Sequence, residues 1–163
     1  MRRFLRGFGY AGQGIAAALR EERNFRFHLC AAAYVLAFGR FYPFGPTEWA
    51  LLFLCIAGVM ALELVNSALE RAVDHPDAAH WQAAGAAKDM AAGAVLVFSI
   101  GAAAIGISLF WRQEVLMEIW RWLWDEPVRA ALLAASLAAA ALFVFWPEHL
   151  KQTKEQKKRT VTV

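Results

Sequence analysis

One uncharged stretch, from Ala91 to Trp111, limits what this chain can fold into more than any other feature. An α-helix needs about 20 apolar residues to cross the hydrocarbon core of a bilayer, and this stretch reaches that length. Three more apolar blocks run from about Phe25 to Phe38, from Trp49 to Glu63 and from Ala130 to Trp146. The 163 residues are 60% hydrophobic and only 19% charged, which is more apolar material than a soluble domain of this size can bury. The sequence therefore predicts an all-α integral membrane helical bundle, and it excludes a disordered chain, a disulfide-rich scaffold and an ordinary soluble enzyme.

Two further segments are expected at the membrane surface. Met1–Arg23 mixes arginines with phenylalanine, leucine and isoleucine, which is typical of an amphipathic helix that lies on the bilayer. Arg112–Pro127 carries three tryptophans, and tryptophan favours the interface between membrane and water. We therefore divide the chain into a surface helix with three spans (1–111), an interfacial loop (112–127), a fourth span (128–147) and a basic tail (148–163).

The basic residues predict how the chain is oriented. With four spans both termini lie on one side, and that side holds all of the 17 lysines and arginines except Arg40, Arg112, Arg121 and Arg129. Because cytoplasmic segments carry the excess of basic residues, both termini are expected to face the cytoplasm. The net charge is only +3 and the basic residues lie at membrane edges, so no nucleic-acid partner is expected.

A stripe of polar residues occupies one face of the second predicted span. At about 100° per residue, Glu70 and Asp74 each fall about 20° from Glu63, and Asn66 and Ser67 lie within about 60° of it. Ionisable residues inside spans are rare and are functional candidates. Like charges on one face repel each other, so other cations, protons or a divalent metal must compensate them.

Further charged residues are predicted on the same side of the membrane. Glu21, Glu22 and Arg23 precede the first span, and Lys88 with Asp89 opens the third. Carboxylate and amide oxygens suit Mg²⁺ and cations suit phosphate, so the set points to a metal–nucleotide site with one carboxylate as a base. Two alternatives stay open. The stripe could be an interhelical salt-bridge network in a structural subunit, or it could conduct protons or cations in a small carrier.

Four segments together resemble a known family. They are Gly9-Tyr10, the run Glu22-Arg23-Asn24-Phe25-Arg26-Phe27-His28, the pattern Glu63-x-x-Asn66-Ser67-Ala68-x-Glu70-x-x-x-Asp74, and Ala87-Lys88-Asp89-Met90 with the small residues that follow. In this order they are similar to the motifs of the small bacterial membrane lipid kinases, which are the prokaryotic diacylglycerol kinases and their undecaprenol kinase relatives. The resemblance covers about residues 2–111. It implies a surface helix with three spans, a homotrimer, and ATP-dependent phosphorylation of a lipid hydroxyl at the cytoplasmic face of the bacterial inner membrane.

The resemblance also implies roles for single residues. Glu63 would be the catalytic base, and Glu22 and Glu70 would hold the Mg²⁺ that bridges the phosphates of ATP. Asn66 would be a further active-site residue. Besides Glu22 and Glu70, the ATP-binding residues implied in this way are Arg3, Tyr10, Asp74, Ala79, His80, Trp81, Lys88 and Asp89.

The choice of lipid also follows from the resemblance. The run Asn24–His28, His80 and the small residues at 91–93 are more similar to the undecaprenol kinase branch than to the diacylglycerol kinase branch, so undecaprenol is the favoured substrate. The span Ala130–Trp146 and the basic tail exceed the usual length of the family. They are either a peripheral addition or a change in lipid access or in the oligomer.

Overall fold

The computed structural model describes residues 2–73 and 82–145, and within them it is all-helical. The helices are α1 (Arg2–Glu21), α2 (Arg23–Gly39), α3 (Pro46–Val73), α4 (Gln82–Phe110), α5 (Gln113–Asp125) and α6 (Pro127–Val144). In the described residues there is no strand, and the predicted all-α class is confirmed.

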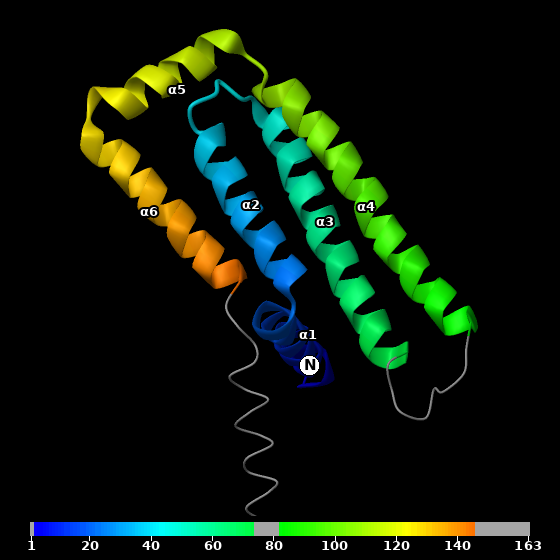
Figure 1. Ribbon diagram of the computed structural model, residues 1–163. Helices are drawn as coiled ribbons and strands as arrows, with labels where there is room; N and C mark the ends of the chain where they lie inside the picture. The colour runs from blue at the N-terminus through cyan, green and yellow to red at the C-terminus, as the bar shows by residue number, and fades with distance from the viewer. Residues whose placement is uncertain (1, 74–81, 146–163) are drawn as a thin grey trace, which may run out of the picture.

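Four of the helices form an elongated bundle. Figure 1 shows α6, α2, α3 and α4 side by side in that order, with their axes along a common direction. Three helices in the described part of the chain are long and apolar enough to cross a membrane, namely Pro46–Val73, Ala84–Phe110 and Pro127–Val144. The expected span at Phe25–Phe38 lies in α2, which has 17 residues and carries Arg23 and Arg26 in its first turn. At 17 residues α2 is shorter than these three helices and is not among them, although it lies within the bundle.

The tightest packing joins α3 to α4. Gly58 of α3 faces the ring of Phe98 on α4, and any Cβ at position 58 would overlap that ring. The absence of a side chain at Gly58 therefore allows the two helices to approach closely. Away from this contact many large apolar side chains of both helices, such as Leu54 and Val97, are exposed. Exposed apolar surface of this extent is what a lipid-facing helix requires.

An aromatic cluster closes one end of the bundle. The Tyr42 hydroxyl donates a hydrogen bond to the carbonyl of Phe110 at 2.9 Å, and the Tyr42 and Phe110 rings meet edge to face at 4.8 Å between their centroids. Burial raises the pKa of Tyr42, which keeps this donor protonated. Close by, α5 crosses this end of the bundle (Figure 1). The segment expected as an interfacial loop therefore contains an amphipathic helix, with Trp122 packed against Phe41.

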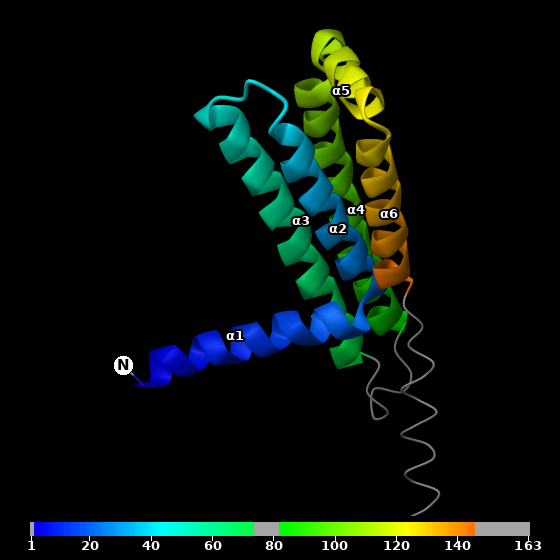
Figure 2. The same ribbon diagram turned by 90° about the vertical axis from the view of Figure 1, so that its left-hand side faces the viewer.

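The surface helix α1 leaves the opposite end of the bundle. Figure 2 shows α1 projecting sideways from the bundle, across the direction of the other helices. Phe4, Phe8 and Ile15 of α1 are exposed, and the helix is strongly amphipathic, as expected for a segment that lies on a bilayer. At the same end α2 begins, α3 and α6 finish and α4 begins (Figures 1 and 2). We call this the α1 end.

Candidate active site at the α1 end

The polar stripe of α3 is buried where it reaches the α1 end. Glu63, Asn66 and Ser67 are exposed by only 3%, 7% and 4%. Glu70 is half-buried one turn further on, and its Oε1 accepts a hydrogen bond from Asn66 Nδ2 at 3.1 Å. Leu52 and Val59 are the other buried residues of α3, so the polar stripe continues the apolar face of α3 toward the surface. A buried carboxylate costs free energy unless it is compensated, so the environment of Glu63 is decisive.

The junction of α1 and α2 supplies that environment. The chain turns at Glu22, which has an extended backbone (φ −102°, ψ 114°) and precedes the first residue of α2. Glu22 of the junction and Glu70 of α3 both act electrostatically on Glu63, and the polar side chain of Asn24 also acts on it. The structure thus brings together Glu22, Glu63 and Glu70, the three carboxylates to which the sequence assigned the chemistry.

Arg71 compensates part of this negative charge. Its Nη2 lies 2.9 Å from Glu22 Oε1 and 3.1 Å from Glu21 Oε2. The three side chains are partly exposed, so these ion pairs contribute little to stability by themselves. They do hold the end of α3 to the α1–α2 junction. The salt-bridge alternative left open from the sequence includes Arg71, whereas Asn24 was given no role of its own, although it stands two residues after Glu22.

Lys88 and Asp89 lie on α4 at the height of the α3 stripe. The helices α3 and α4 run antiparallel (Figure 1), and counting back from the contact between Gly58 and Phe98 places Lys88 level with Ala68, between Asn66 and Glu70. Lys88 is half-buried and Asp89 is exposed. The structure therefore places a cationic side chain at the level of the carboxylates.

Of the remaining predicted residues, those that the structure describes are not brought to this cluster. Tyr10 of α1 is 70% exposed. Arg3 is the second residue of α1, at the far end of this helix from Glu22, and its side chain is not described. Asp74, Ala79, His80 and Trp81 lie outside the described residues, so their predicted contacts with ATP stay predictions.

Two cavities adjoin the cluster. One, of about 510 Å³, lies in the angle between α1 and α3, between Gly14 and Ala18 on one side and Ser67 and Arg71 on the other. The second is an apolar groove of about 350 Å³ between α2, α3 and α4. We call it the chain groove.

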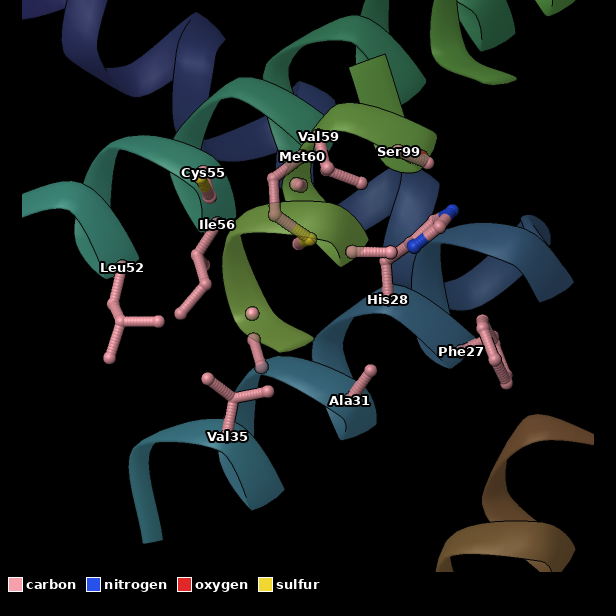
Figure 3. Close-up of a pocket in the computed structure, with 14 residues that line it drawn as sticks. Phe27, His28, Ala31, Val35, Leu52, Cys55, Ile56, Val59, Met60 and Ser99 are labelled. Atoms are coloured by element: carbon pink, nitrogen blue, oxygen red, sulfur yellow. The ribbon is translucent and has the colours of Figure 1, made fainter. Parts of the chain in front are cut away.

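The chain groove leads toward Glu63. Figure 3 shows its wall, with Phe27, His28, Ala31 and Val35 from α2 and Leu52, Cys55, Ile56, Val59 and Met60 from α3. Val59 and Met60 precede Glu63 by about one helical turn, so the groove ends next to the level of the buried carboxylate. A hydrocarbon chain in this groove would therefore place a polar end group close to Glu63.

The residues present are compatible with a divalent metal. In the described part of the chain no group of three or more His, Cys, Asp and Glu side chains is close enough to enclose an ion. Mg²⁺ does not need such a cage, because it commonly takes one or two carboxylates, water and substrate phosphates. Asn66 Oδ1 is buried and has no hydrogen-bond partner among the described residues. This amide oxygen, on the side chain that donates to Glu70, could therefore bind a metal ion. Glu22 and Glu70 with this amide oxygen form a donor set that suits Mg²⁺.

Comparisons with known proteins show which proteins this chain is similar to. The model of the prokaryotic diacylglycerol kinase family matches residues 9–110. Undecaprenol kinase from Bacillus subtilis (strain 168) is 44% identical over 110 residues, which are 68% of this chain and 89% of that protein. Diacylglycerol kinase from Escherichia coli (strain K12) is 30% identical over 109 residues, 67% of this chain and 89% of that protein. Diacylglycerol kinase from Synechocystis sp. is 38% identical over 100 residues, 61% of this chain and 57% of that protein. No solved structure matches the chain significantly.

Proposed function

Because this chain belongs to the prokaryotic diacylglycerol kinase family, and is therefore a membrane lipid kinase, we propose that it transfers the γ-phosphate of Mg²⁺-bound ATP to the hydroxyl group of undecaprenol. The observation that carries the proposal is the position of Glu63, a buried carboxylate between the chain groove and the charged α1 end. The similarity to a Bacillus subtilis undecaprenol kinase, at 44% identity, supports this lipid over diacylglycerol.

The proposed reaction is an in-line phosphoryl transfer. The lipid chain lies in the chain groove, and its hydroxyl oxygen attacks the γ-phosphorus as the bond from that phosphorus to the β,γ-bridging oxygen of ATP breaks. Glu63 accepts the hydroxyl proton, and the products are the lipid monophosphate and ADP. Most of the catalysis is positioning and charge neutralisation, and Lys88 contributes a cation for the phosphate oxygens.

Glu22, Glu70 and Asn66 are the residues proposed to hold Mg²⁺. When bound there, the metal would neutralise the charge of the phosphates. In the structure described here Arg71 pairs with Glu22, so nucleotide and metal binding would have to compete with that ion pair. Asp89 and the predicted contacts of Arg3, Tyr10, Asp74, Ala79, His80 and Trp81 complete the proposed ATP site.

The domain organisation and orientation belong to the same proposal. Residues 1–111 form the kinase unit, and the α1 end faces the cytoplasm, where ATP is available. α6 is an additional span beyond the region that the family model matches. A homo-oligomer, expected as a trimer, stays a prediction.

The proposal is tested by comparing two lipids directly. Purified protein in mixed micelles receives ATP and Mg²⁺ with either undecaprenol or diacylglycerol, and phosphorylated lipid is quantified. We expect Mg²⁺-dependent transfer with a higher kcat/KM for undecaprenol. Faster transfer to diacylglycerol would correct the substrate, and no transfer to either lipid would overturn the proposed reaction.

A matched pair of variants tests the proposed base. Glu63→Gln keeps the shape of the side chain but cannot accept the proton, so we expect the protein to fold and kcat to fall by about 100-fold or more. Glu118→Gln on α5 is the control, because Glu118 is exposed and lies far from the α1 end, and it should retain wild-type turnover. Wild-type turnover by Glu63→Gln would remove Glu63 from this role.

A further inference from the structure

The additional helix α6 is tied to the candidate active site by a buried arginine. Arg26, the fourth residue of α2, is only 4% exposed. Its Nη2 donates a hydrogen bond to the carbonyl of Val144, at the C-terminal end of α6, at 3.2 Å. Its Nη1 donates to the carbonyl of Arg20 at 3.0 Å and lies 3.5 Å from the carbonyl of Leu19, both at the C-terminal end of α1.

In this arrangement one side chain donates hydrogen bonds to the unpaired carbonyl groups at two helix ends. The last carbonyls of a helix have no partner within the helix, and the negative end of the helix dipole favours a cation there. The C-terminal ends of α1 and α6 both present such carbonyls, and the fork of the guanidinium can donate to both at once. Two helices that are far apart in the sequence are thereby held against the start of α2.

Weaker contacts hold α6 along the same face of α2. The Tyr34 hydroxyl donates to Ser136 Oγ at 3.1 Å, and the Arg23 guanidinium lies 5.9 Å from the centre of the Phe145 ring. In both Figure 1 and Figure 2 α6 lies beside α2, and it packs mainly against α2 and α5. Its C-terminal end is therefore fixed chiefly by the first turns of α2.

Those first turns also carry part of the candidate site. Glu22 immediately precedes α2 and the polar side chain of Asn24 acts on Glu63, while Arg26 follows Glu22 by one helical turn. We propose that α6 positions the active site through Arg26, a positioning residue that ties the C-terminal ends of α1 and α6 to the α1–α2 junction. The catalytic part of this proposal rests on the proposed lipid kinase reaction. The additional span is thus a working part of the enzyme rather than a peripheral addition.

The link is tested first without reference to activity. In a full-length chain with Cys30→Ala and Cys55→Ala, spin labels at Gln13→Cys on α1 and Leu142→Cys on α6 report the distance between these two helices by pulsed electron paramagnetic resonance. Both labelled positions are exposed. We expect Arg26→Gln to broaden the distance distribution. Arg129→Gln is the control, because Arg129 donates to the Trp122 carbonyl at 2.9 Å and so caps α5 at the opposite end of α6.

The same variants are then compared as enzymes. We expect Arg26→Gln to lower kcat by about 10-fold to 100-fold while the KM for the lipid stays within about twofold, because the junction moves but the chain groove does not. Arg129→Gln should keep wild-type kcat. An unchanged distance distribution in Arg26→Gln, an equal broadening in Arg129→Gln, or a broadening with no loss of kcat would each overturn the proposal.

Two provisions keep these outcomes decisive. If Arg26→Gln does not fold, Arg26→Lys replaces it, because lysine keeps the charge but lacks the fork that reaches two helix ends. A distribution unchanged by Arg26→Lys would then overturn the proposal. If the unsubstituted protein phosphorylates no lipid, the proposed function fails, whereas the distance measurement still decides whether Arg26 joins α1 to α6.

Discussion

At the scale of single residues, the site is a set of carboxylates. Some have partners on the same helix face, and others have partners on a different helix. The helical period of the sequence predicts that Glu63, Asn66 and Glu70 share one face, and the structure buries Glu63 and Asn66 together. The pairing of Arg71 with Glu22 could not be predicted in the same way. These residues are 49 positions apart, and only the crossing of α1 with α3 brings them within 2.9 Å.

A variant at Glu70 separates metal binding from a structural role. Glu70→Gln keeps an oxygen that can accept the hydrogen bond from Asn66 but removes the charge that would bind Mg²⁺. We expect the Mg²⁺ concentration for half-maximal activity to rise by about tenfold or more, measured from initial rates at fixed ATP. Glu118→Gln serves as the control. An unchanged Mg²⁺ dependence would favour the alternative that Glu70 belongs to a salt-bridge and hydrogen-bond network only.

At the scale of elements, the length and hydropathy of the segments predicted where the helices lie in the sequence. They did not predict how the helices pack against each other. The uncharged stretch Ala91–Trp111 lies almost wholly within α4, but α4 begins at Gln82, because a helix continues past the apolar core through Lys88 and Asp89. The amphipathic pattern at the N-terminus predicted α1, whereas its direction away from the bundle depends on contacts that no single segment encodes. The anchoring of α6 by Arg26 likewise could not be predicted from one segment, because it requires the start of α2 and the C-terminal ends of α1 and α6 to meet.

The contact between α3 and α4 gives a prediction about stability. Gly58→Leu places a side chain where the Phe98 ring lies, so the helices must separate or the ring must move. Overpacking of this kind costs about 1–3 kcal/mol, and we expect a lower melting temperature in detergent by circular dichroism. Gly101→Leu on α4 is the matched control, because nothing lies within 4 Å of a Cβ built at Gly101. Equal melting temperatures for the two variants would show that the close approach at Gly58 does not stabilise the bundle.

At the scale of the whole molecule, the charged groups and the chain groove lie at different depths along the bundle. The α1 end gathers the carboxylates, Arg71 and Lys88, and the groove approaches it from within the apolar bundle. Such an arrangement serves a reaction that joins a lipid to a water-soluble nucleotide only if the α1 end faces the compartment that contains ATP. The orientation of the chain is therefore a condition of the proposed function.

Labelling from the two sides of the membrane tests that orientation. In the background Cys30→Ala and Cys55→Ala, Gln13→Cys marks α1 and Gln113→Cys marks α5, and both positions are exposed at opposite ends of the bundle. The positive-inside rule places α1 in the cytoplasm. We therefore expect a membrane-impermeant maleimide to label Gln113→Cys in intact spheroplasts and Gln13→Cys only in inverted vesicles. The reverse pattern would place Glu63 and its neighbours on the side without ATP, and the lipid kinase reaction could not proceed as proposed.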